Sequence, residues 1–313
     1  RYLMDQNNVP FLIHGDSPWE LIVNITKEDA NEYLENRRQK GFNSIVVELI
    51  EYYYSPNPPY NIYGNAPFTT PGDFSTPNEA YFAHADWVIQ KAAEKGIIVM
   101  LNPCYLGGAG GYNAAFDGWW KEIVANGPTK CRNYGRYIGN RYKNFNNIIW
   151  VAGGDQTPLP GSDREKNWIQ ILLGIKDNSP NQLWTAHWNN DINSFDVAAF
   201  RPYMDLNGIY AYADSFTHEY IHQRMLSAYN NGEFPTFTLE TEYEGGKVEG
   251  NTVSLQTIRR QAYESNLCGS TGQNFGSVYI FAFGFEFINE GSFDWRWGIE
   301  QSGSYYMTLV KQL

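Results

Sequence analysis

Short apolar segments recur along the chain, and each is followed by a polar or glycine-rich stretch and then by a segment with helical periodicity. The apolar segments are rich in β-branched and aromatic residues, as in the run Ile148, Ile149, Trp150 and Val151, which is typical of buried strands. We therefore predict eight strands, at residues 10–15, 42–50, 96–102, 147–152, 183–187, 206–212, 235–240 and 278–283.

Helical patterns follow these strands. Residues 26–41 begin at Thr26, a predicted N-cap, and end at Gly41. Residues 78–96 place four apolar side chains on one face and stop at Gly96. Those four are Tyr81, Ala85, Val88 and Ala92. Further helices are expected to begin near Phe116, Arg164, Ser194, Thr217, Ser254 and Ser304.

Eight strand–helix units in one chain predict a (β/α)8 TIM barrel, an α/β fold. Such a barrel needs about 250 residues, and the 313 residues of this chain therefore leave room for long strand-to-helix loops. A doubly wound open sheet is the alternative, but it usually has a phosphate-binding turn after its first strand. Here that turn reads HGDSPWEL, without the glycine spacing or a lysine. No linker or shift in composition interrupts the chain, so we expect a single domain over residues 1–313.

The composition narrows the classes of partner. A net charge of −11 disfavours nucleic acids and anionic membrane surfaces, which need clustered lysine and arginine. No apolar run approaches the roughly 20 residues of a membrane-spanning helix. Three cysteines form no disulfide framework in a chain of this length, although one pair remains possible. Aromatic residues make up 16% of the chain, and their flat rings suit either a large core or a cleft for sugars.

Polar and aromatic residues gather where the predicted strands end, and in such barrels the active site lies at those ends. A polar surface loop is the alternative for any single residue. The residues that we assign to substrate binding are Asp16, Trp19, Glu48, Asn102, Tyr105, Gln156, His187, Trp188, Tyr210, Tyr212, Tyr243, Glu244 and Phe283. Glu51, directly after the predicted strand that contains Glu48, belongs to the same group of polar strand ends.

Two carboxylates are the candidate catalytic pair. Asp155 follows the fourth strand, and Glu240 ends the seventh, in which we expect Phe237 and Leu239 to face outward and Glu240 inward. Cleavage of a glycosidic bond needs an acid for the leaving oxygen and a second carboxylate as nucleophile or base. Glu242 and Glu244, in the loop after the seventh strand, remain open alternatives. Helix capping or pairing with an arginine is the non-catalytic interpretation of both carboxylates.

Two glycines precede Asp155, and without Cβ atoms this turn is able to lean over the barrel mouth. That movement brings Asp155 closer to Glu240. Retaining glycosidases hold their two carboxyl groups about 5–5.5 Å apart, whereas inverting enzymes leave about 6.5–9.5 Å. We therefore expect a retaining mechanism.

Five segments together carry a resemblance to a known family: GDSPWEL, PNEAYFAHADWVIQKAAEKGIIV, NNIIWVAGGDQ, ETEYEGG and IRRQAYESNLCGSTG. Their order and their spread over nearly the whole chain resemble the apiosidase-like barrels of glycoside hydrolase family 140. The resemblance implies a bacterial hydrolase of plant cell-wall polysaccharide, with apiose side chains of pectin as the target class. It places the proton donor on Asp155 and the nucleophile on Glu240. We expect an oligo- or polysaccharide substrate, no metal or other cofactor, a monomer, and secretion or a periplasmic location.

Competing signals point elsewhere. HEYIH, from His218 to His222, fits the zinc-protease pattern, but it opens a predicted barrel helix without a third ligand. YLGGAGGYN, from Tyr105 to Asn113, is glycine-rich, yet it lacks the Lys-Ser/Thr of a phosphate loop. A barrel that binds carbohydrate without cleaving it, and a hydrolase of the same fold acting on another glycan, are the rival functions.

Overall fold

Eight parallel strands form the centre of the computed structural model, which describes residues 2–107, 118–212, 220–232, 234–248, 250–284 and 293–312. Neighbouring strands follow the order β7-β6-β5-β4-β3-β12-β9-β8, so the two ends of the sheet meet in a nearly closed barrel. The strands are β3 (Ile13–Asp16), β4 (Ser44–Glu48), β5 (Ile98–Asn102), β6 (Ile148–Gly153), β7 (Trp184–His187), β8 (Asn207–Tyr210), β9 (Thr236–Glu240) and β12 (Gly272–Phe275). The predicted (β/α)8 barrel is confirmed.

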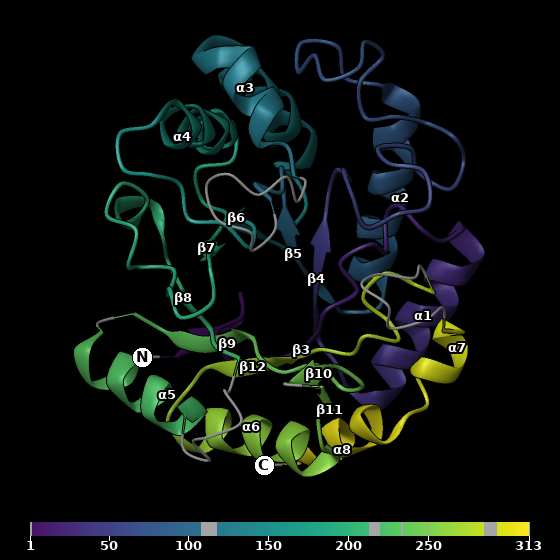
Figure 1. Ribbon diagram of the computed structural model, residues 1–313, viewed down its shortest axis with the longest axis vertical. Helices are drawn as coiled ribbons and strands as arrows, with labels where there is room; N and C mark the ends of the chain where they lie inside the picture. The colour runs from purple at the N-terminus through teal and green to yellow at the C-terminus, as the bar shows by residue number, and fades with distance from the viewer. Residues whose placement is uncertain are drawn as a thin grey trace.

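Helices surround the strands, and α1 to α6 follow the chain order around the outside (Figure 1). The last of them, α8, returns beside α1. The helices are α1 (Lys27–Lys40), α2 (Glu79–Glu94), α3 (Trp120–Tyr142), α4 (Asp163–Lys176), α5 (Tyr220–Asn231), α6 (Leu255–Leu267), α7 (Trp295–Gly298) and α8 (Ser302–Val310). Two short antiparallel ladders complete the described elements, β1 (Leu3–Met4) with β2 (Pro10–Phe11) and β10 (Lys247–Val248) with β11 (Asn251–Thr252).

Local signals in the sequence set the ends of the first two helices. The Thr26 side chain accepts a hydrogen bond from the amide of Asp29, and Gly41 closes α1 in the left-handed region at φ 87°. Asn78 caps α2, and the four apolar residues predicted for its inner face are all buried. The helices predicted near Phe116 and Thr217 begin, among described residues, at Trp120 and Tyr220.

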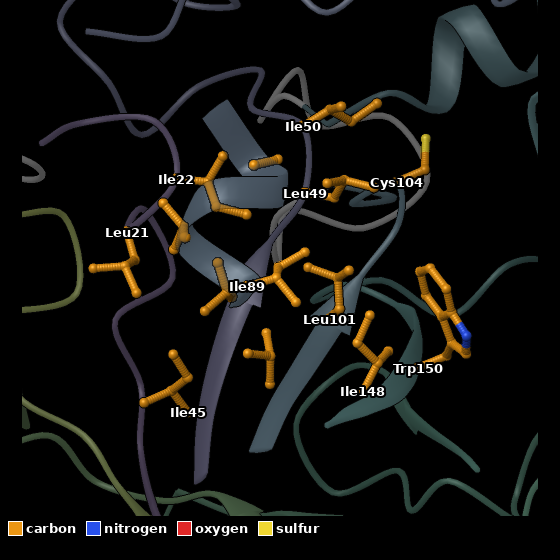
Figure 2. Packing of buried hydrophobic residues seen from close by; sticks show 14 of the residues in the cluster. Leu21, Ile22, Ile45, Leu49, Ile50, Ile89, Leu101, Cys104, Ile148 and Trp150 are labelled. Carbon is orange, nitrogen blue, oxygen red and sulfur yellow. The ribbon is translucent and has the colours of Figure 1, made fainter. Parts of the chain in front are cut away.

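Alternation along the strands divides the core into two layers. One set of side chains fills the barrel, among them Val46, Met100 and Ile149. The other set points outward and packs under the helices, as Ile45 and Leu101 do against Ile89 of α2 (Figure 2). Both layers are apolar, so the interior of the barrel is a packed core.

The eighth strand was predicted in the wrong place. Residues 278–283 form turns, and the strand is instead the polar segment GQNF, residues 272–275. A Cβ atom on Gly272 would lie 2.0 Å from the carbonyl oxygen of Ile13, so only glycine lets β12 pair with β3 here. Asn274 is buried and donates a hydrogen bond to the carbonyl of Leu239. Hydrogen bonding within the barrel, rather than apolar character, makes this segment a strand.

Two further predictions need correction. The first predicted strand, residues 10–15, is divided between β2, which pairs with β1, and the barrel strand β3. The helix expected near Ser194 is absent from the described segment between β7 and β8, which has turns and a 3₁₀ helix at Arg201–Tyr203. The apolar residues there pack a loop against α4, and Phe200 contacts Trp168.

Ser194 joins the two strands that do not pair directly in the sheet. Its hydroxyl donates to the carbonyl of Ala186 in β7 at 2.7 Å and accepts from the amides of Ala186 and Gly208, at 3.0 and 2.9 Å. The same hydroxyl also lies 3.0 Å from the Thr185 hydroxyl, so Ser194 is the centre of a buried group of polar atoms. A Cβ atom on Gly208 would come within 3.0 Å of the Ser194 hydroxyl, which explains the glycine on β8.

No described helix has the length and apolar character needed to cross a membrane. The three cysteines are free thiols; Cys104 and Cys131 are buried, and Cys268 is half-buried.

We predict that Ser194→Ala lowers the free energy of unfolding by about 1–3 kcal/mol, because two buried amides and a carbonyl lose their partner. Urea denaturation monitored by tryptophan fluorescence measures the change. Ser302→Ala, at an exposed position in α8, is the matched control and is expected to unfold like the unmodified protein. Equal stability of the two variants would show that closure of the barrel between β7 and β8 does not depend on Ser194.

Candidate active site

A cavity of about 470 Å³ opens at the carboxyl ends of the barrel strands. It is lined by side chains from almost every strand end and by the β10–β11 ladder. These residues are Trp19, Glu48, Tyr54, Tyr105, Asp155, His187, Tyr212, Glu240, Glu242, Tyr243, Gly246, Lys247, Val248, Val278 and Phe281. The two predicted catalytic carboxylates therefore share one cavity with six of the residues assigned to substrate binding, Trp19, Glu48, Tyr105, His187, Tyr212 and Tyr243.

Aromatic rings form a closed circle around this cavity. Successive ring centroids lie 4.5–6.4 Å apart, mostly edge to face, as aromatic rings prefer. The order around the circle is Tyr105, Tyr54, Phe281, Tyr243, Tyr212, Tyr210, His187, Trp19 and again Tyr105. Trp19 is also held by a hydrogen bond from its indole nitrogen to the Tyr243 hydroxyl at 2.9 Å. Rings so fixed offer a rigid, largely apolar wall to a ligand.

Two glycines bring Asp155 to this wall. Gly153 and Gly154 have φ values of 84° and 126°, and a Cβ atom on either would lie 2.3–2.4 Å from the His187 carbonyl or the Tyr105 ring. Asn102 and the amide of Leu106 both donate to the carbonyl of Gly153, each at 3.0 Å. The turn thus lies directly against its neighbours, and the Asp155 side chain is 20% exposed.

Glu240 reaches the cavity for a different reason from the one predicted. Phe237 and Leu239 point into the barrel, and Thr238 points outward to Ser265 of α6, so the expected alternation was wrong. The pairing of β8 with β9 is irregular, because one step along β8 spans two residues of β9, from Thr238 to Glu240. Such a bulge redirects the side chains that follow it. This irregularity is what turns Glu240 toward the cavity.

His187 lies between the two carboxyl groups. The backbone amide of Asp155 donates to His187 Nδ1 at 3.1 Å, and His187 Nε2 lies 2.5 Å from Glu240 Oε2. Since Nδ1 accepts, the proton of the neutral ring resides on Nε2 and is donated to Glu240. The Tyr212 hydroxyl donates to the other oxygen, Oε1, at 2.6 Å. Two donors therefore orient Glu240, and one of them is fixed by the backbone of Asp155.

The protonation of this group follows from its burial. Burial raises the pKa of Asp155 to about 6; His187 opposes this shift and Glu240 adds to it, while hydrogen bonds from Tyr105 and Tyr210 lower the pKa. Burial lowers the pKa of His187, but Glu240 and Asp155 outweigh it and the net shift is upward. An aspartic acid with a pKa near 6 is suited to giving up a proton near neutral pH.

Seven of the residues assigned to substrate binding do not line the cavity: Asp16, Asn102, Gln156, Trp188, Tyr210, Glu244 and Phe283. Asp16 is fully buried, where it pairs with Arg37 at 2.7 Å and accepts from Tyr33 at 2.6 Å. These contacts join β3 to α1. Asn102 supports the glycine turn. Tyr210, which completes the circle of rings, stacks on His187 with ring centroids 4.5 Å apart but does not line the cavity.

The remaining four lie elsewhere in the core. Arg164 donates to the side chain of the buried Gln156. Trp188 was expected on the rim but is fully buried against Phe200. Glu244 accepts from the amide of Gly303 at 2.6 Å. Phe283 packs on Tyr33 and Trp295, an error that follows from the misplaced eighth strand.

Several lining residues were not predicted. Tyr54 belongs to a long loop after β4, and Phe281 belongs to the segment that was read as a strand. Glu242, which strand parity left open, lines the cavity and is 6% exposed. Lys247 and Val248 come from the β10–β11 ladder, which no periodic pattern in the sequence predicts. The cluster of three tyrosines at residues 52–54 was the one available signal for the loop.

Two groups of three described residues have metal-ligand types within reach of one another, namely Asp155, His187 and Glu240, and the buried set Glu20, Glu48 and Glu51. In the first group His187 Nδ1 already accepts from a backbone amide and Nε2 faces Glu240, so the ring offers no vacant lone pair. Of the HEYIH segment, His218 and Glu219 lie outside the described residues, and His222 Nδ1 lies 3.0 Å from Cys268 Sγ. Most of the glycine-rich segment at 105–113 also lies outside them.

A parallel eight-stranded barrel that presents an acid with a raised pKa opposite a second carboxylate, inside a cup of aromatic rings, has the equipment of a glycoside hydrolase. Solved structures of other proteins share this fold. A protein described as a glycoside hydrolase superposes with a TM-score of 0.82 and 23% identity, covering 100% of this chain and 72% of the other. A glycoside hydrolase family 5 protein from Bacteroides vulgatus ATCC 8482 gives a TM-score of 0.81 and 23% identity, covering 99% and 69%.

A family 5 mannosidase from Rhizomucor miehei has a TM-score of 0.67 and 11% identity, covering 98% of this chain and 94% of the other. At these identities the likeness concerns the fold. No curated protein matches the sequence. The chain belongs to the family described as apiosidase-like, catalytic domain, which matches residues 1–313. It is a glycoside hydrolase, as the sequence resemblance indicates.

We predict that kcat/KM falls as the pH rises above about 6, because Asp155 then loses the proton that a leaving group needs. The pH profile of kcat/KM reports the free enzyme, which is the state described here. An aryl glycoside whose leaving group departs without protonation is the control, and its alkaline decline should be weaker. A profile that stays flat to pH 8 for the natural substrate would contradict a proton held by Asp155.

Proposed function

We propose that this enzyme removes apiose-containing side chains from plant cell-wall pectin by a retaining, two-step mechanism. Asp155 acts as acid and base, and Glu240 acts as nucleophile. The observation that carries the mechanism is the separation of the two groups, because one oxygen of each lies within 4.8 Å of the other. Such a close approach fits a retaining enzyme, whose two carboxyl groups lie about 5–5.5 Å apart.

In the first step Glu240 attacks the anomeric carbon while Asp155 gives its proton to the departing glycosidic oxygen. The product is a glycosyl ester on Glu240 and a carboxylate on Asp155. In the second step Asp155 takes a proton from water, the water oxygen attacks the anomeric carbon, and the ester bond to Glu240 breaks. Each residue returns to its starting state.

His187 and Tyr212 keep Glu240 aimed during both steps, since they donate to different oxygens of its carboxylate. Trp19, Tyr105 and Tyr243 offer ring faces and edges to the sugar, which is the role expected of them from the sequence. Because the proposed substrate is a polymer, the enzyme is expected to be secreted or periplasmic. It is proposed to act as a monomer.

The sugar is assigned through the family, whose description names apiosidases. Release of apiose from rhamnogalacturonan-type pectin, measured by chromatography of the products, tests the assignment, with mannan as the comparison substrate. Release of sugar from mannan alone would move the enzyme to another glycan. Binding of pectin without release of any sugar would favour a carbohydrate-binding barrel that does not cleave.

We predict that Asp155→Asn and Glu240→Gln each lower kcat by orders of magnitude without unfolding the protein, since both changes are nearly isosteric. Glu28→Gln, at an exposed position in α1, is the control and should keep the full rate. A tenfold loss of rate corresponds to only ~1.4 kcal/mol. If a variant keeps more than about a tenth of the rate, the replaced residue does not have the catalytic role assigned to it. Loss of activity in Glu242→Gln with full activity in Glu240→Gln would transfer the nucleophile to Glu242.

The retaining mechanism predicts a first-formed sugar with the same anomeric configuration as the substrate. Proton NMR of the reaction with an aryl glycoside, recorded before mutarotation, distinguishes the two anomers. An inverted product would make Glu240 a general base that activates water.

A further inference from the structure

Three glutamates converge behind the wall of the cavity. Glu20 and Glu51 are fully buried, and Glu48, at the end of β4, is 1% exposed and lines the cavity. One carboxyl oxygen from each lies within 4.8 Å of the others. The proposed mechanism uses none of them.

No described cation balances this cluster. Among the described lysines, arginines and histidines, none forms an ion pair with Glu20, Glu48 or Glu51. Neither oxygen of Glu20 receives a hydrogen bond, and Glu51 Oε2 has no donor either. Three ionised carboxylates buried together without a cation are untenable, because each loses its hydration and repels the others. The cluster therefore contains protons, unless it binds a cation.

The contacts indicate where the protons reside. Glu51 Oε1 accepts the backbone amides of Tyr53 and Tyr54, which stabilise its ionised form. A proton on Glu20 that is donated to Glu51 gives Glu51 the donor that it lacks and gives Glu20 a hydrogen-bond partner. Burial raises the pKa of Glu20 and of Glu48 well above the usual range, and the neighbouring glutamates add to both shifts. Burial raises the pKa of Glu51 too, but here hydrogen bonds from Glu20 and from the backbone oppose the effect of burial.

We propose that Glu48 is a substrate-positioning residue that presents a neutral carboxylic acid to the cavity and donates a hydrogen bond to an oxygen of the bound sugar. The inference rests on the proposed function only in taking the ligand to be a sugar. A protonated glutamate beside Asp155 adds a donor where an ionised one would add only a further negative charge.

The titratable groups that interact electrostatically with Glu48 come from five parts of the fold and include no described cation. They are Glu20 after β3, Glu51 and Tyr54 after β4, Tyr81 of α2, Cys104 and Tyr105 after β5, and Asp155 after β6. Asp155 titrates next to Glu48, so any pH experiment on Glu48 is repeated in variants of Asp155. Loss of the Glu48 proton would place a charge beside Asp155 and raise the pKa of Asp155 further.

Infrared difference spectra between the unmodified protein and single variants test the protonation without any substrate. At pH 7 we expect Glu48→Gln and Glu20→Gln each to remove a band of a protonated carboxyl group, and Glu51→Gln to remove bands of a carboxylate. The bands of the unmodified protein should persist at pH 8. Loss of carboxylate bands alone in Glu48→Gln would overturn the proposal even if the enzyme proves fully active on pectin.

Calcium and magnesium ions are the test for a cation in the cluster. After chelation, neither ion should raise the melting temperature of the unmodified protein relative to Glu20→Gln. Stabilisation by either ion that is lost in Glu20→Gln, together with loss of the protonated-carboxyl bands, would replace the protons with a cation and overturn the proposal.

Binding supplies the second measurement. In an Asp155→Asn background, Glu48→Ala should weaken binding of a pectin side-chain oligosaccharide about tenfold, the value of one hydrogen bond of ~1.4 kcal/mol. Glu48→Gln keeps a donor and should recover most of that affinity, whereas Glu48→Asp shortens the reach and should not. Equal losses in Glu48→Ala and Glu48→Gln would show that an ionised Glu48 binds the sugar. Near-ultraviolet circular dichroism identifies any variant that fails to fold.

Discussion

Closure of the barrel between β7 and β8 determines whether the two halves of the active site meet. Asp155 and His187 follow strands on one side of this seam, and Tyr210, Tyr212 and Glu240 follow strands on the other. The two strands are not paired in the sheet, and the Ser194 hydroxyl satisfies backbone groups of both. The stacking of His187 on Tyr210 and the bond from His187 to Glu240 cross the same seam higher up. The relative position of Asp155 and Glu240 therefore depends on this closure of the barrel.

The second constraint is the loss of hydration when carboxyl groups are buried. It gives neighbouring carboxyl groups different roles. Asp155, partly exposed to the cavity, has a pKa raised to about 6 by burial, which suits an acid. Glu240 has two hydrogen-bond donors and is held as an acceptor. The cluster behind Glu48 has almost no donors, and protons are the natural substitute. Similar side chains within one small region thus differ because their hydrogen-bond partners differ.

Much of the site followed from where strands end. Asp155, His187 and Tyr212 were predicted correctly at the cavity because parallel strands deliver their carboxyl ends to one rim. Glu240 was also placed there, but by an alternation that the structure reverses, and a bulge in the β8–β9 pairing restores the outcome. Trp188 and Phe283 fail because an aromatic residue after a strand serves the outer core as readily as the rim. Tyr54, Lys247 and Val248 come from loops, whose paths no periodic pattern encodes.

The sequence by itself determined the (β/α)8 class, the ends of the best-capped helices, and the two carboxylates of the candidate pair. These depend on local periodicity, capping residues and the order of strands, all of which are short-range properties of the chain. Only the tertiary structure decided that GQNF is the eighth strand, that His187 bridges Asp155 and Glu240, and that Glu20, Glu48 and Glu51 share one buried site. Those facts depend on contacts between residues far apart in sequence, on the space a glycine leaves, and on which polar groups lose water together.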